Sequence, residues 1–170
     1  MSMAAARSDR VSGLTLGNTW FWKDTSPTMR LFSRFMSTGF MQRRILENNW
    51  FVERGVPIGA TIKLSNEVME HYRAVQPTPE MRVALPIAPR EILASGDWLE
   101  DLEAQVKANL ASKPVLLVWG MKDIAFRPKF LTRMKEVFPD RVVVELPKAK
   151  HYIQEDTPNE IITAIINRFD

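Results

Sequence analysis

Two side chains that could transfer a proton each follow a buried strand in this sequence. Asp123 comes shortly after the apolar run Pro114–Trp119, which ends at Gly120, and His151 follows a β-branched run, Arg141–Leu146. In parallel sheets, reactive groups collect where strands end and loops begin. A buried carboxylate that accepts the imidazole N–H fixes the tautomer, so the other ring nitrogen can take a proton from water. The order predicts a carboxylate–imidazole pair with His151 as the base.

Each of these residues also has an ordinary structural interpretation. An aspartate after a strand-ending glycine is usually a turn former, and a loop histidine can simply be hydrogen-bonded in place. The other histidine, His71, lies on an expected helix and is interpreted as a surface residue. The pair gains weight because each member follows its own strand.

The elements that must position the pair alternate between strand and helix. Val11–Gly17 is interpreted as a further short buried strand, and helices are expected over Asp97–Leu110 and Arg127–Phe138. The last helix is expected to open with a capping box, Thr157–Glu160. Its expected buried stripe is Ile161, Ile162, Ile165, Ile166 and Phe169. Strands that alternate with helices predict parallel pairing, so the fold class is α/β.

A helical block over Lys23–Leu85 interrupts this alternation. Ser26 and Ser65 are expected N-caps, and apolar residues recur at helical spacing after each of them. The stretch Phe40–Val52 also has a helical pattern. The block is therefore predicted to be a helical insertion in the α/β fold.

Composition is typical of a globular chain and excludes several classes of protein. Of 170 residues, 45% are hydrophobic and 25% are charged, and the net charge of +3 forms no basic stripe, so we expect no nucleic-acid partner. The absence of cysteine excludes disulfides and thiolate metal sites. No apolar run approaches the ~18 residues of a membrane span. We expect a cytoplasmic protein with no membrane contact, no metal and no cofactor.

Four segments together resemble the haloalkane dehalogenases, which are α/β-hydrolases with an inserted helical cap. They are LTLGNTWFW (14–22), YRAVQPTPEMR (72–82), PVLLVWGMKD (114–123) and HYIQEDTP (151–158). The resemblance implies the C-terminal part of an α/β-hydrolase fold, with the last three parallel strands. It makes residues 1–22 the end of the helix after the nucleophile plus the sixth core strand, 23–85 the cap, and 86–170 the C-terminal core with strands seven and eight.

The resemblance also implies a two-step mechanism. An aspartate displaces halide to form an ester, and a water activated by histidine then hydrolyses that ester. His151 is the implied base and Asp123 its partner. Some relatives place this carboxylate after the sixth strand, about where Trp20 stands here. The implied substrate is small, apolar and halogenated. Candidate pocket residues are Trp20, Trp22, Phe32, Phe35, Met36 and Tyr72, although core packing of the cap also explains such an aromatic stripe.

The nucleophile elbow of such enzymes is not found in the sequence. Neither Gly-x-Asp-x-Gly nor Gly-x-Ser-x-Gly occurs, and Asp97-Trp98 has neither a preceding strand nor small residues after it. A further departure is Lys150, where relatives often have glycine. We therefore expect that this chain alone is not catalytically competent. Residues Val11–Leu16 would leave an unpaired apolar edge, so we expect self-association, poor solubility or pairing with a complementing N-terminal fragment.

Two other functions remain open from sequence. Epoxide hydrolases share the fold, but the resemblance then requires two cap tyrosines, and only Tyr72 lies in the cap region, with Tyr152 beside the base. A non-catalytic binding or assembly module is the alternative from a different class.

Overall fold

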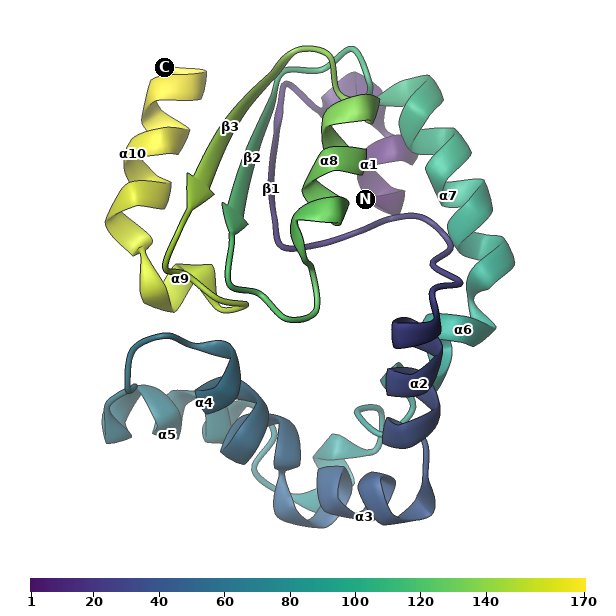
Figure 1. Cartoon of the computed structure of the whole chain (residues 1–170), viewed down its shortest axis with the longest axis vertical. Helices are drawn as coiled ribbons and strands as arrows, with labels where there is room; N and C mark the ends of the chain where they lie inside the picture. The colour runs from purple at the N-terminus through teal and green to yellow at the C-terminus, as the bar shows by residue number, and fades with distance from the viewer. The chain divides into compact units, whose positions relative to one another are not determined.

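The strands of this chain form one three-stranded parallel sheet. The computed structural model describes all 170 residues. The strand order is β1-β2-β3, with β1 at Leu14–Gly17, β2 at Val115–Gly120 and β3 at Arg141–Leu146. Leu14 is opposite Val115, which in turn is opposite Arg141. All three carboxyl ends therefore meet at one edge of the sheet, as Figure 1 shows.

The chain divides into two compact units, described separately here. The core unit contains residues Met1–Phe21, Gly59–Ile62 and Asp101–Asp170, and the helical unit contains Trp22–Ile58 and Lys63–Glu100. The α/β class is confirmed in the core unit. The assignment of the helical unit to a cap stays a prediction.

Helices cover the sheet of the core unit. Its elements are α1 (Ser2–Ala6), η1 (Ser8–Arg10), most of α7 (Gly96–Asn109), α8 (Pro128–Val137), α9 (Ile153–Asp156) and α10 (Pro158–Phe169). All six residues of β2 are buried, as expected for a central parallel strand with both faces covered. Leu116 and Val118 pack with Ile153 of α9 and with Ile161 and Ala164 of α10.

The predicted stripe of α10 is wrong for most of its residues. Ile161 packs against the core cluster, whereas the side chains of Ile162, Ile165, Ile166 and Phe169 are exposed. The helix is apolar on more than one face, and hydrophobic spacing alone does not tell which face is covered. The capping box is also not formed, because the Thr157 hydroxyl donates backward to the Ile153 carbonyl at 3.2 Å.

The first strand is shorter than predicted. It begins at Leu14, because Val11–Gly13 make no ladder with β2. At Gly13, a side chain would collide with the ring of Phe169. The segment therefore passes α10 closely before it joins the sheet.

The helical unit contains short helices with side-chain caps. Its elements are α2 (Pro27–Met36), α3 (Gly39–Asn48), the π-helical turn η2 (Phe51–Gly55), α4 (Val56–Gly59) except its last residue, α5 (Asn66–Val75), η3 (Pro79–Arg82), α6 (Ala88–Ala94) and the start of α7. Ser26 and Ser65 accept backbone N–H groups, which confirms both predicted caps. The expected helix over Phe40–Val52 is interrupted at Asn49, which has a left-handed backbone with φ 49°.

Buried residues of two kinds hold this unit together. Met36, Met41 and Ile45 form an apolar cluster. The buried guanidinium of Arg82 donates hydrogen bonds to the backbone carbonyls of Leu46, Glu47, Gln76 and Pro77. No helix of either unit combines the length and apolar character that crossing a membrane requires.

Candidate active site

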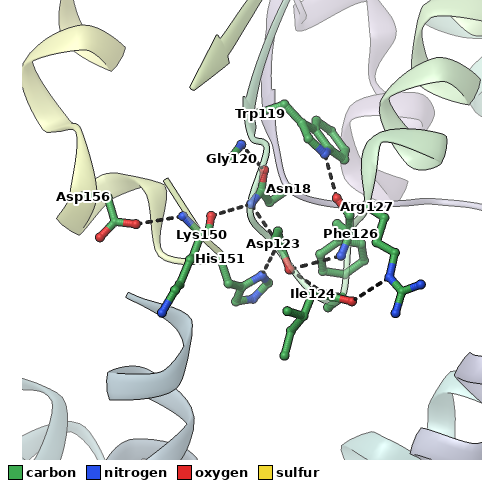
Figure 2. A network of polar contacts seen from close by, with 11 residues as sticks. Asn18, Trp119, Gly120, Asp123, Ile124, Phe126, Arg127, Lys150, His151 and Asp156 are labelled. Carbon is green, nitrogen blue, oxygen red and sulfur yellow. Dashed lines mark hydrogen bonds and ion pairs between the residues drawn. The ribbon is translucent and has the colours of Figure 1, made fainter. Parts of the chain in front are cut away.

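The loops after β2 and β3 bring the predicted pair into contact. His151 Nδ1 lies 2.8 Å from Asp123 Oδ2. Figure 2 shows this contact as a dashed line between the two side chains. The Asp123 side chain is fully buried, whereas 41% of the His151 side chain is exposed. With Nδ1 bound to the carboxylate, Nε2 is the ring nitrogen that remains for proton transfer.

Asp123 is held by four donors. Its Oδ1 accepts the N–H groups of Ala125 at 2.7 Å and Phe126 at 3.1 Å, the local turn that aspartate commonly forms. Its Oδ2 accepts the amide of Asn18 at 2.8 Å as well as the imidazole. Burial alone would raise the pKa of Asp123, but the hydrogen bonds from His151 and Ala125 outweigh it, so the pKa lies below its usual value.

Asn18 is the site residue that sequence reasoning missed. It directly follows β1 and is buried, with a left-handed backbone at φ 36°. Its Oδ1 accepts the N–H of Gly120, and its Nδ2 donates to Asp123 Oδ2 and to the Lys150 carbonyl, each at 2.8 Å. One amide thus joins the ends of all three strands. The group that reaches Asp123 from the end of β1 is therefore Asn18.

Aromatic rings surround the imidazole. Phe126 stacks on His151 with ring centroids 5.5 Å apart, and Tyr152 meets the imidazole edge-on at 5.3 Å. Trp20 stacks in turn on Phe126 at 5.2 Å. The Trp20 indole N–H is buried without a hydrogen-bond acceptor. The imidazole of His151 is therefore flanked by aromatic rings, while its Nδ1 atom faces the Asp123 carboxylate.

Comparisons with known proteins show which proteins this chain is similar to. The chain matches no protein-family model. It is 51% identical over 170 residues to "Haloalkane dehalogenase 2" of Mycobacterium tuberculosis, an alignment that covers 99% of this chain and 59% of the relative. This chain is a haloalkane dehalogenase homologue. This chain is also 35% identical over 135 residues to a haloalkane dehalogenase of Bradyrhizobium diazoefficiens. That alignment covers 77% of this chain and 44% of the relative.

Solved structures of haloalkane dehalogenases superpose on nearly the whole of this chain. The crystal structure of haloalkane dehalogenase DbeA from Bradyrhizobium elkani superposes with a TM-score of 0.82 at 29% identity, over 97% of this chain and 60% of that one. This chain therefore spans about three fifths of the length of the two relatives that align with nearly all of it. Its strands and helices are a C-terminal portion of the α/β-hydrolase fold, which confirms the predicted family and fold class.

The other predicted pocket residues of this chain lie in its helical unit. Trp22 and Met36 are buried, and Met36 belongs to the apolar cluster of that unit. Phe32 and Phe35 are exposed on α2, and Tyr72 is half-buried on α5. Of the six candidates, Trp20 is the one that the core unit brings to the Asp123–His151 pair.

Three further residues discussed in the sequence analysis, His71, Asp97 and Trp98, lie on helices of this chain. His71 is exposed on α5, as expected. Asp97 lies in the first turn of α7 and pairs with Lys23 at 3.1 Å, while Trp98 is exposed. No group of three or more His, Asp or Glu side chains is placed to hold a metal ion.

Proposed function

We propose that this chain provides the general base of a haloalkane dehalogenase-type hydrolase. The observation that carries the proposal is the 2.8 Å contact between His151 and the buried Asp123 at the carboxyl edge of the sheet. His151 Nε2 takes a proton from water as that water attacks the carbonyl carbon of an alkyl-enzyme ester. Asp123 stays ionised, keeps the imidazole in one tautomer and stabilises the imidazolium that forms.

The same proposal assigns a role to each of the two units and places the substrate pocket. The core unit is the C-terminal core of the hydrolase and the helical unit its cap. The substrate is a small apolar haloalkane, supported by the names of the relatives. We assign Trp20 and Phe126 to the wall of its pocket, because they form a continuous stack with the imidazole. The unpaired indole N–H of Trp20 is available to an acceptor atom there.

The nucleophile comes from polypeptide outside these 170 residues. Its Gly-x-Asp-x-Gly motif does not occur in the sequence. Without it, no ester forms for His151 to resolve, so the chain alone does not release halide.

The test combines this chain with the part of the Mycobacterium relative that this chain does not cover. Bromide release from 1,2-dibromoethane is expected only when both pieces are present. In the complex, His151→Gln is expected to release about one equivalent of bromide and then stop, with the alkyl ester left on the fragment and visible by mass spectrometry. His71→Gln is the matched control and is expected to turn over normally.

Two outcomes contradict the proposal. Continued turnover by the His151→Gln complex would exclude His151 as the base that resolves the ester. Bromide release by the chain alone would show that its nucleophile lies within these residues.

A further inference from the structure

A four-residue segment, Gly59–Ile62, joins the core unit although both of its flanks belong to the helical unit. We call it the tether. The Gly59 carbonyl accepts the N–H groups of His151 at 2.8 Å and Tyr152 at 3.0 Å. The Thr61 hydroxyl donates to the Lys148 carbonyl at 2.8 Å. The tether is thus hydrogen-bonded along the loop that carries the proposed base.

The approach at Gly59 needs a glycine. A Cβ atom at this position would lie 2.7 Å from Cδ2 of Tyr152 and 3.4 Å from Cβ of His151. A larger residue at position 59 would push the tether away from the loop that carries His151 and Tyr152. The close backbone contact therefore requires glycine at this position.

One carboxylate, that of Asp156, connects the tether to the loop. Its Oδ2 accepts the N–H of Lys150 at 2.9 Å. Its Oδ1 accepts the N–H groups of Thr61 at 2.6 Å and Ile62 at 3.3 Å. Its own N–H donates to the Tyr152 carbonyl at 3.1 Å. Both chain neighbours of His151 are therefore bonded to Asp156.

The electrostatics favour an ionised Asp156. Partial burial alone would raise its pKa, but the hydrogen bonds from Lys150 and Thr61 outweigh that effect and hold the pKa below its usual value. Hydrogen bonds to a charged acceptor are stronger than neutral ones. The ionised carboxylate is therefore well suited to fix three backbone N–H groups.

We propose that Asp156 is a positioning residue for His151, which clamps the base-bearing loop to the tether and so keeps the imidazole on Asp123. This inference rests on the proposed function for its catalytic meaning. Asp156 touches neither the imidazole ring nor Asp123 and acts through the backbone of Lys150 and Tyr152. Displacement of a catalytic group by about 1 Å can cost about 100-fold in rate, so such a clamp matters for a base.

The test is an NMR comparison of the full 170-residue chain with its Asp156→Asn variant. Hydrogen exchange of the His151 and Tyr152 amides is expected to become about tenfold faster or more, because a charge-assisted anchor of the loop is lost. The Nδ1 proton of His151 is expected to lose its hydrogen-bonded resonance. Amides of β2 are expected to exchange as in the parent chain. Asp140→Asn, which removes a carboxylate at the opposite end of β3, is the control and is expected to leave the His151 signals unchanged.

A second variant covers the case in which Asp156→Asn fails to fold. Thr61→Val removes the hydroxyl that binds the Lys148 carbonyl, and it is expected to speed the same two amides by a smaller factor. Unchanged His151 signals in a folded Asp156→Asn chain, or equal acceleration of the β2 amides, would overturn the inference. These readouts need no turnover, so a failed complementation assay would remove the proposed function while the clamp is still tested.

Discussion

Replacement of Asn18 by alanine tests how the three strand ends are held together. The change removes one hydrogen bond to the Asp123 carboxylate and two bonds with backbone groups, those of Gly120 and Lys150. A bond to a charged group contributes about 1.5–3 kcal/mol and a neutral one about 0.5–1.5 kcal/mol. A left-handed backbone costs alanine about 1 kcal/mol more. We expect the free energy of unfolding to fall by about 3.5–7 kcal/mol, a large part of the stability of an ordinary domain.

The assay is urea unfolding of matched variants. Asn18→Gly loses the same hydrogen bonds but tolerates the left-handed backbone, so it is expected to be less destabilised than Asn18→Ala by about 1 kcal/mol. A double-mutant cycle with Asp123→Asn is expected to show coupling of about 0.5–3 kcal/mol, since the two side chains are in contact. A loss below about 1 kcal/mol for Asn18→Ala, or strictly additive effects, would refute the reasoning.

Two further predictions concern pH and the helical unit. Because the pKa values of Asp123 and Asp156 are lowered on folding, their stabilisation is complete above the ordinary aspartate pKa of about 3.9 and is lost as pH falls through the lower folded-state values. Urea midpoints measured against pH should therefore fall less steeply for Asp156→Asn than for the parent chain, and parallel curves would contradict this. Arg82→Met leaves four backbone carbonyls without their buried donor, and it is expected to destabilise the helical unit by about 3 kcal/mol or more. Hydrogen exchange should then rise in α3 and α5 but not in β2, and protection that stays unchanged in α3 would contradict the assignment.

The Asp123–His151 contact could be predicted because it depends on chain order alone. Each residue follows a parallel strand, and parallel strands end at the same edge of a sheet. The family could also be recognised, because its motifs lie in continuous segments of the sequence. Asn18 and Asp156 were not found, because each joins segments that lie far apart along the chain, about 90 to 130 residues for the contacts of Asn18 with Lys150 and of Asp156 with Thr61. An asparagine directly after a strand-ending glycine is the one signal that was available for Asn18, since asparagine tolerates a left-handed backbone.

The errors in α10 have a different cause. Isoleucine at 161, 162, 165 and 166 gives helical spacing on two adjacent faces, so periodicity predicts the helix but leaves the covered face open. The structure covers the side with Ile161 and Ala164. The predicted capping box failed because the Thr157 hydroxyl found an acceptor within the preceding helical turn.

The placement of Gly59–Ile62 limits how this protein can be re-engineered. The polypeptide passes between the two units at residues 21–22, 58–59, 62–63 and 100–101. Excising residues 22–100 as one cassette, the obvious way to exchange the helical unit, would delete the Gly59 carbonyl that accepts the His151 and Tyr152 N–H groups. A chimaera that is to keep a working loop must therefore splice in two inserts and retain these four native residues between them.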